Sequence, residues 1–349
     1  EGFREKESNM GSIKKKIGIA VSAVGLCIVA ATFVSVVRAN STDKVEIRLA
    51  HNQAAGSEIA DSIAKFSEFV AEDDSMNLDV NIYASGVLGS EKEEIEMVQA
   101  GILDMAKVSS NTLGQFEDRY SIFAVPYLFV DQDHYYTAME KSQEVKDLFM
   151  STEDQGYIAI GYYANGARNF YLKEDAVCDN PSVLKGKKIR SMPSSTSMEM
   201  IQAMGGSPVP MAGSETYTAL QQGIVDGAEN TELALTVDAH EDLVSSYTYT
   251  EHQYSPDIYI ISTKKWNSLT KEQQDYLVEC LEKTNENFKK LYNGMMDEAM
   301  EEAEEHGVHV YRDIDKSAFI EAVQPIHEEF CGKGKDYQAL YDDIQSYAE

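Results

Sequence analysis

Residues 44–83 read KVEIRLAHNQAAGSEIADSIAKFSEFVAEDDSMNLDVNIY and contain two periodicities in turn. Polar and apolar side chains alternate over residues 44–50, which predicts a half-buried β-strand. Over residues 57–71 the apolar side chains instead recur on one helical face, at Ile59, Ile63, Phe66 and Val70. Residues 78–83 again have the composition of a strand. The segment therefore predicts a strand, a helix and a second strand in succession.

The same order of strands and helices continues along the chain. Ser90 and Glu93 have the spacing of a capping box that starts a helix, and residues 102–108 read as the next strand. A second set follows, with a strand at 187–192 and helices at 197–204 and 215–223. This order predicts an α/β architecture with largely parallel sheets.

Two connections, near residue 165 and over residues 254–259, are expected to divide the chain into two lobes. Lobe I would contain residues 44–165 and 256–295. Lobe II would contain residues 166–255 and 296–349.

Residues 271–306 contain no proline and one glycine. Their apolar stripe predicts one long amphipathic helix or two abutting helices, and such a length would suit a brace across both lobes. Shorter terminal helices are expected at 318–330 and 337–347.

The first 39 residues have the pattern of a targeting segment. Lys14, Lys15 and Lys16 precede an uncharged run over residues 17–37, and Ala39 offers a small residue where a signal peptidase cleaves. Residues 1–39 are therefore expected to be a signal peptide or, because an apolar run of this length can also span a bilayer, an uncleaved N-terminal anchor. Both alternatives predict an extracytoplasmic location for the folded chain.

The chain is strongly acidic, with 59 acidic and 30 basic residues and a net charge of −29. Phosphate backbones and anionic lipid surfaces would repel it, which excludes nucleic acid as a partner. The four cysteines, Cys27, Cys178, Cys280 and Cys331, are too few and too scattered for a disulfide framework. Because Cys27 lies in the apolar run, at least one of the other three thiols is expected to be free.

Motifs of catalysis are missing from the sequence. No Gly-x-Ser-x-Gly nucleophile elbow or phosphate-binding loop occurs, and Cys178 has no adjacent base. His240-Glu241 lacks the second histidine of a metalloprotease, and His306 with His309 flanks a helix end without a third ligand nearby in sequence. The sequence gives no positive argument for an enzyme, a metal or a cofactor. An exported enzyme or sensor subunit without a familiar motif stays open as an alternative.

Arginine is scarce after residue 40, where five arginines stand against nineteen lysines. We therefore expect arginine where a planar, forked donor is required. Arg168 lies near the first lobe connection and Arg190 ends a strand. Two guanidinium groups near one boundary could grip a carboxylate bidentately from two sides. A pair of ordinary salt bridges is the alternative interpretation.

Several short motifs follow one another in a specific order over about residues 44–305. They are Leu88-Gly89-Ser90, Pro126-Tyr127-Leu128-Phe129, Gly186-Lys187-Lys188-Ile189-Arg190, Glu215-Thr216-Tyr217-Thr218-Ala219-Leu220-Gln221-Gln222-Gly223 and Val225-Asp226-Gly227-Ala228-Glu229-Asn230. Together they resemble the solute-binding proteins of TRAP transporters. The resemblance implies a hinged, two-lobe α/β fold of the periplasmic-binding-protein type (type II), with a long helix bracing both lobes.

The resemblance also implies a function. Members of the family close on a small organic acid and deliver it to the membrane subunits of an ion-driven transporter, with no catalytic residue, metal or cofactor. An arginine at the position of Arg168 or Arg190 binds the ligand carboxylate, and an asparagine matching Asn230 orients it. We expect this chain to act in the same way, as a monomer.

Four positions in the first lobe bear on the kind of acid. Asn52 and Glu91 match contact positions of the family, and His51 and Ser109 are expected beside them at strand ends that face a cleft. Glu91 can accept hydrogen bonds from sugar hydroxyls and repels a second carboxylate. We expect a sugar acid such as a uronate or an aldonate, with a C4-dicarboxylate or a keto acid as the alternative. Gly213 stands where many members have an aromatic residue.

Overall fold

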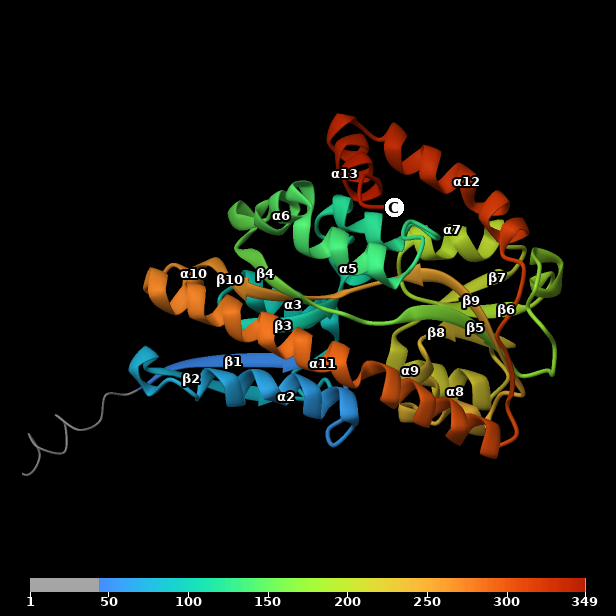
Figure 1. Ribbon diagram of the computed structural model, residues 1–349, viewed down its shortest axis with the longest axis horizontal. Coiled ribbons are helices and arrows are strands. Elements are labelled where there is room, and N and C mark those ends of the chain that lie inside the picture. The colour runs from blue at the N-terminus through green and yellow to red at the C-terminus, as the bar shows by residue number, and fades with distance from the viewer. Residues whose placement is uncertain (1–43, 349) are drawn as a thin grey trace, which may run out of the picture. The chain divides into compact units, whose positions relative to one another are not determined.

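The computed structural model of the protein describes residues 44–348 (Figure 1). The expected signal peptide or anchor, residues 1–39, lies outside this part of the chain. No helix within residues 44–348 has the length and apolar character needed to cross a membrane.

The structure contains eleven strands and twelve α-helices within residues 44–348. The strands are β1 (Val45–His51), β2 (Leu78–Tyr83), β3 (Met105–Ser109), β4 (Tyr157–Tyr163), β5 (Ala167–Leu172), β6 (Lys188–Ser191), β7 (Ser207–Pro210), β8 (Gly227–Asn230), β9 (Ser246–Tyr254), β10 (Asp257–Ser262) and β11 (His309–Tyr311). The helices are α2 (Glu58–Val70), α3 (Glu91–Gln99), α4 (Ser110–Leu113), α5 (Gln132–Lys141), α6 (Gln143–Met150), α7 (Ser195–Ala203), α8 (Thr216–Gln221), α9 (Glu232–Val237), α10 (Thr263–Trp266), α11 (Lys271–Glu305), α12 (Ser317–Gly332) and α13 (Lys335–Gln345).

Two separate sheets form the centres of two lobes, which confirms the α/β, two-lobe architecture. The first sheet has the order β2-β1-β3-β10-β4, and the second has the order β11-β9-β5-β8-β6-β7. The chain passes to the second sheet between Tyr163 and Ala167 and returns between Tyr254 and Asp257. These short segments overlap the two expected connections. The assignment of whole residue ranges to each lobe stays a prediction.

Both sheets are mixed, so the expectation of largely parallel sheets is wrong. β1 and β3 are parallel, but β10 runs antiparallel to both β3 and β4. Asp257, the first residue of β10, pairs with Ser109, the last residue of β3. β10 enters the sheet from the second lobe, at the edge where β3 ends, and it must therefore run in the opposite direction.

Helix α11 contacts both lobes, as the sequence predicted. It is one helix of 35 residues that begins with a capping box between Thr270 and Gln273. It packs against α2 and β4 in the first lobe and against α9 and β11 in the second (Figure 1). The predicted capping box of Ser90 and Glu93 at the start of α3 is also confirmed.

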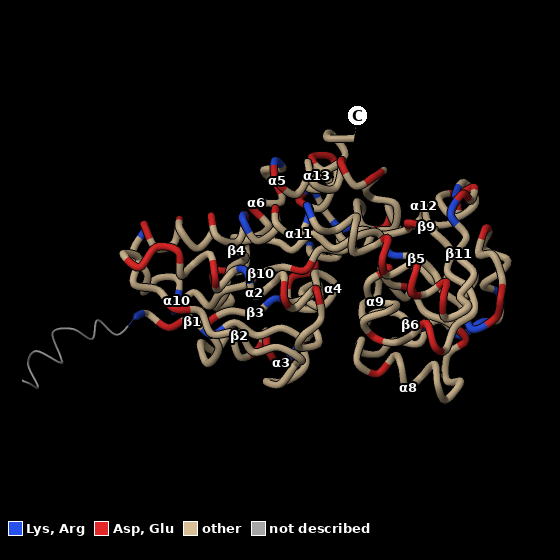
Figure 2. Tube along the Cα trace, turned by 60° about the horizontal axis from the view of Figure 1, so that its bottom comes forward, with Lys and Arg blue, Asp and Glu red and all other residues tan. Residues whose placement is uncertain are grey.

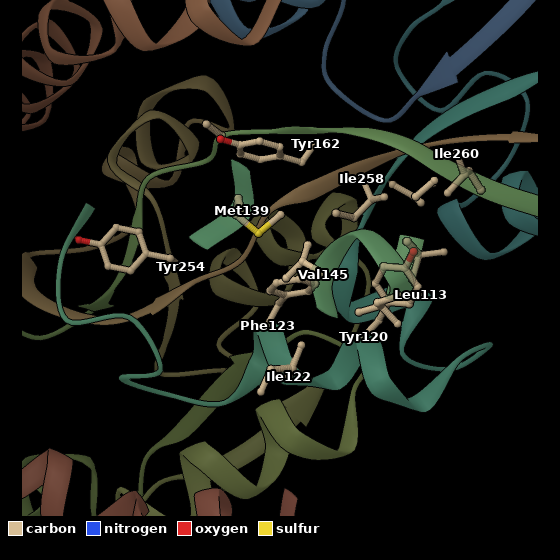
Figure 3. Packing of buried hydrophobic residues seen from close by; sticks show 14 of the residues in the cluster. Leu113, Tyr120, Ile122, Phe123, Met139, Val145, Tyr162, Tyr254, Ile258 and Ile260 are labelled. Atoms are coloured by element: carbon tan, nitrogen blue, oxygen red, sulfur yellow. The ribbon is translucent and has the colours of Figure 1, made fainter. Parts of the chain in front are cut away.

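The two terminal helices pack on different lobes. α12 contacts α7 of the second lobe, whereas α13 packs against α5 and α6, which cover the first sheet. The buried cluster of the first lobe accordingly includes Leu340 and Ile344 of α13 beside residues of β10 and α5. Figure 3 shows part of this cluster, including Ile258 and Ile260 of β10 and Met139 of α5. Burial of each such side chain contributes about 1.5–3 kcal/mol.

The second sheet is covered on both faces. Phe170 lies in one buried cluster with residues of α7 and α12, and its neighbour Tyr171 lies in another with residues of α8, α9 and α11. Successive side chains of a strand point to opposite faces, which explains why two adjacent residues belong to different clusters. All three cysteines of the described chain, Cys178, Cys280 and Cys331, are free. Acidic residues are distributed along the chain of both lobes (Figure 2).

Candidate functional site

The predicted site residues lie where strands of the two lobes end close to one another. Asn111, just after β3, accepts a hydrogen bond from Ser197 Oγ of α7 at 3.0 Å. Gln115 Nε2 donates to the carbonyl of Pro193, which follows β6, at 2.9 Å. The hydroxyl of Ser109 lies 3.9 Å from the sulfur of Met192. The carboxyl ends of β3 and β6 are therefore side by side, although they belong to different sheets.

Four residues of the first lobe, Asn52, Glu91, Ser109 and Thr112, form a hydrogen-bonded set that we call the first-lobe group. Glu91 is its centre. One of its carboxylate oxygens accepts from Asn52 Nδ2 at 3.0 Å and from the Ser109 N–H at 3.2 Å. The other accepts from Thr112 Oγ1 at 2.6 Å. Burial, followed by the negative charge of Asp257, raises the pKa of Glu91. The fold thus brings Asn52, Glu91 and Ser109 together and adds Thr112, which the sequence had not indicated.

His51 is buried at the end of β1 and supplies a hydrogen-bond donor. Its Nδ1 accepts from the Gln53 N–H at 3.2 Å, so the proton of the neutral ring is on Nε2. Nε2 has no hydrogen-bond partner among the described residues. Burial, together with the positive charge of Lys107, lowers the pKa of His51 to about 4. The ring is therefore neutral at pH 7, and its side chain forms no hydrogen bond with the other six predicted site residues.

Lys107 and Asp257 form a buried ion pair behind the first-lobe group. Lys107 also lies 5.0 Å from the centre of the Tyr163 ring, over its face. Each charge has its counter-ion within the lobe, so neither requires a ligand to compensate it.

Arg168 on β5 is held by two neighbouring residues of β8. Its Nε and Nη2 donate to the two carboxylate oxygens of Glu229, Nη2 also donates to the Glu229 carbonyl, and Nη1 donates to Asn230 Oδ1 at 2.7 Å. These bonds use four of the five N–H groups of a guanidinium. One Nη1–H remains for another partner.

Glu229 is the residue that sequence reasoning missed in this group. It is fully buried, and His252 Nε2 lies 3.5 Å from its carboxylate. Burial acts to raise its pKa, but the charge of Arg168, the proximity of His252 and the hydrogen bonds from Arg168 bring it down to about 2. The sequence offered one indication of this ion pair, because Glu229 lies in the strand-like segment Gly227–Asn230. A glutamate in such a segment is expected to be buried, and a buried carboxylate requires a cationic partner.

Arg190 on β6 has a different environment. The residue is 4% exposed, its Nη2 donates to the carbonyl of Met211 at 3.0 Å, and its Nε has no hydrogen-bond partner among residues 44–348. It forms no ion pair with any described carboxylate, and burial lowers its pKa. A Cβ atom added at Gly213 would lie 3.9 Å from Nη2. Arg190 is thus a buried cation without an ion pair in the described chain, although the negative charges of Glu229 and Asp238 act on it from beyond ion-pair distance.

The structure therefore separates the seven predicted residues into three groups. Arg168 and Asn230 are bonded to each other, Asn52 and Ser109 are bonded to Glu91, and Arg190 and His51 have unpaired donors. Neither arginine points to bulk solvent. Arg168, however, has the ion pair that was the alternative interpretation of the sequence. Contact of these residues with a solute stays a prediction.

A surface hollow of about 410 Å³ lies near the junction of the lobes. One wall is the loop of residues 54–57 with the first residue of α2, and the other is α9 of the second lobe, with α11 completing the lining. The two lobes are thus separated by open space at this point.

Comparison with known proteins identifies the family. Residues 49–333 match the model of the bacterial extracellular solute-binding proteins, family 7. The protein YiiZ of Salmonella typhimurium is 38% identical over 293 residues, which cover 82% of this chain and 88% of that protein.

Solved structures give the same result. A TRAP periplasmic solute-binding protein of Anaerococcus prevotii with bound D-glucuronate has a TM-score of 0.82 and 34% identity, covering 87% of this chain and 98% of the other. One from Sulfitobacter with bound β-D-galacturonate has a TM-score of 0.80 and 28% identity, covering 86% and 99%.

These matches confirm the resemblance that the sequence motifs indicated. They also confirm the extracytoplasmic location and the interpretation as a binding protein rather than an enzyme. Proteins of this kind bind small solutes and work with membrane subunits. By the extent of these matches, the chain belongs to the bacterial extracellular solute-binding proteins of family 7, the DctP family of TRAP transporter receptors.

Proposed function

We propose that this protein is the TRAP receptor for a hexuronate such as D-glucuronate or D-galacturonate. The observation that carries the proposal is the buried guanidinium of Arg190, which has no carboxylate partner among the described residues. An unpaired buried cation is costly, and a bound carboxylate would compensate its charge with bidentate hydrogen bonds.

The other predicted residues suit the rest of a sugar acid. The remaining Nη1–H of Arg168 and the Nε2–H of His51 are free to donate. Glu91 already accepts three hydrogen bonds, and a carboxylate has about four acceptor sites, so one remains for a sugar hydroxyl. In this arrangement Arg190 binds the carboxylate and the first-lobe group binds the hydroxyls.

The two solved structures reported above favour a uronate over the other acids. The solved structures of Anaerococcus prevotii and Sulfitobacter proteins hold D-glucuronate and β-D-galacturonate, respectively. These two sugars have the same carboxylate and the same ring, and they differ in the orientation of one hydroxyl. A second carboxylate, as in a C4-dicarboxylate, would instead need hydrogen-bond donors in the region where Glu91 acts as an acceptor.

Binding would be coupled to closure of the lobes. The carboxylate contacts come from the second lobe and the hydroxyl contacts from the first, so the full binding energy is available only when both lobes touch the solute. Solute therefore shifts the population toward the closed form, which the membrane subunits would then recognise.

The direct test is calorimetric titration of the purified protein. We expect D-glucuronate or D-galacturonate to bind, and we expect neither D-glucose, which lacks the carboxylate, nor succinate to bind with comparable affinity. Tighter binding of succinate than of either uronate would overturn the proposal. Recovery of the uronate unchanged after prolonged incubation, measured by mass spectrometry, separates a receptor from an exported enzyme.

Closure can be measured across the surface hollow. Spin labels can be attached to Ala55→Cys and Thr236→Cys in a Cys331→Ser background. The distance between the two labels should decrease when the uronate is added. Cys178 and Cys280 are buried and should remain unlabelled. A control pair within the first lobe, Ala55→Cys with Lys65→Cys, should keep its separation. An unchanged distance across the hollow, with solute bound, would contradict closure.

A further inference from the structure

A cluster of metal-ligating side chains lies in the second lobe, where the short helix η6 (His240–Asp242) meets the carboxyl end of α11. Within residues 44–348, Glu241, Asp242 and His306 form the one group of three whose ligand atoms all lie within 4.8 Å of one another. None of them belongs to the proposed solute site. We propose that these three side chains bind a divalent first-row transition ion such as Zn²⁺.

His306 is oriented as a metal ligand. Its Nδ1 lies 2.9 Å from the backbone carbonyl of Glu302. A carbonyl can only accept, so Nδ1 carries the proton and the lone pair of the neutral ring is on Nε2. That lone pair is 3.9 Å from Asp242 Oδ1. A hydrogen bond from one ring nitrogen to a backbone carbonyl is the usual way in which proteins fix the tautomer of a ligating histidine.

Glu241 provides the second, independent observation. The residue is 6% exposed, and its Oε2 is buried without a hydrogen-bond partner among the described residues. A buried carboxylate oxygen without a partner is destabilising. The Glu241 carboxylate contributes an oxygen to the cluster, so a cation bound there would compensate this buried carboxylate and would reduce the repulsion between Glu241 and Asp242.

The donor set selects the class of ion. One imidazole nitrogen and two carboxylate oxygens suit Zn²⁺, Co²⁺, Ni²⁺ or Cu²⁺, whereas Ca²⁺ and Mg²⁺ prefer oxygen ligands alone. Zn²⁺ bonds are about 2.0–2.2 Å long, so the side chains need to close by only a small movement. Asp242 and His306 are partly exposed and free to make it. Water would complete the coordination.

The site would join two segments that are distant in sequence. η6 follows α9, and His306 is the C-cap residue that directly follows α11. The sequence showed His306 without a third ligand because Glu241 and Asp242 are more than sixty positions away. A bound ion would fasten the end of the bracing helix to the second lobe.

The test uses the full chain after treatment with EDTA. Titration with Zn²⁺ should show one binding site, and Co²⁺ should give the visible absorption of a protein-bound ion. His306→Gln and Glu241→Gln should each weaken Zn²⁺ binding at least about tenfold. The matched control is His309→Gln, which removes another exposed histidine of the same region and should change the affinity less than about twofold.

Two results would overturn the proposal. One is that the wild-type protein binds no Zn²⁺, and the other is that His309→Gln weakens binding as much as His306→Gln. Circular dichroism of each metal-free variant shows whether it is folded. Should Glu241→Gln not fold, Asp242→Asn at the exposed side of the cluster replaces it, with the same tenfold expectation.

Discussion

Arg168 and Arg190 lie in the same sheet and are both buried, but they differ in how their charges are compensated. The guanidinium of Arg168 is bonded to Glu229 and Asn230, and four of its five N–H groups are used. Arg190 has one hydrogen bond, to a backbone carbonyl, and no ion pair with a described residue. The first arginine therefore contributes mainly to the fold, and the second is the better candidate for the ligand carboxylate.

The same contrast occurs between two buried acids of the two lobes. Glu229 in the second lobe is paired, and its pKa falls to about 2. Glu94 on α3 in the first lobe is 0% exposed, and neither of its carboxylate oxygens has a hydrogen-bond partner within the described chain. Burial, followed by the negative charge of Glu91, raises the pKa of Glu94 to about 8. Both acids are fully buried, so the opposite directions of their pKa shifts come from their partners and not from burial.

The largest expected effect is on the paired arginine. Arg168→Ala leaves the Glu229 carboxylate buried without its cation and should lower the free energy of unfolding of the ligand-free protein by about 3–5 kcal/mol. Urea denaturation measures this loss. The double variant Arg168→Ala/Glu229→Gln, in which the unpaired charge is also removed, should recover part of the stability. A loss below about 1 kcal/mol would mean that the pair is not structural.

Arg190 should respond in the opposite way. Arg190→Met keeps most of the side-chain volume and removes a buried charge that forms no ion pair with a described residue, so the ligand-free protein should keep its stability. Affinity for the uronate should fall by about 30-fold or more, since removing one partner of a buried charge pair costs about 2–5 kcal/mol. The ligand-dependent rise in melting temperature should disappear. An unchanged rise would remove Arg190 from the site.

Because Glu94 is buried without a hydrogen-bond partner in the described chain, we expect the stability of the protein to depend on pH. Between the ordinary pKa of 4.5 and the raised value of about 8, the unfolded chain ionises at Glu94 while the folded chain holds the proton. The wild-type protein therefore loses stability at this residue as the pH rises through that window. Glu94→Gln removes the effect, so its stability relative to wild type should grow by about 1–3 kcal/mol from pH 5 to pH 8.

Glu96→Gln is the matched control for this pH effect, because Glu96 is exposed on the same helix. Its stability relative to wild type should not change with pH. For Glu229, whose pKa is lowered, the sign is reversed, and stability is lost as the pH falls from about 4.5 toward 2. A flat difference between wild type and Glu94→Gln would show that Glu94 is ionised in the fold.

The smallest effect is expected at Gly213. A methyl group there would lie 3.9 Å from Arg190 Nη2, which is an ordinary van der Waals contact. Gly213→Ala should therefore change the stability by less than about 0.5 kcal/mol and the uronate affinity by less than about threefold. Calorimetry checks the affinity. A tenfold loss would indicate that the solute itself occupies the space beside this glycine.

Much of the fold follows from local sequence patterns. The alternation over residues 44–50, the helical stripe of α2, the capping box of α3 and the unbroken length of α11 all predicted elements that the structure contains. The direction of β10 was missed, because it depends on the lobe from which the chain returns. Local periodicity reports which side of an element is buried, and it carries no information about the neighbour that buries it.

The primary sequence thus specified the strands and helices, the two connections and the family, since each depends on residues near one another along the chain. The pairing of Arg168 with Glu229, 61 positions away, and the unpaired state of Arg190 were visible only in the folded chain. The gathering of Glu241 and Asp242 around His306 was hidden for the same reason. Electrostatic and hydrogen-bond energies depend on distance in space, and only packing brings distant residues within that range.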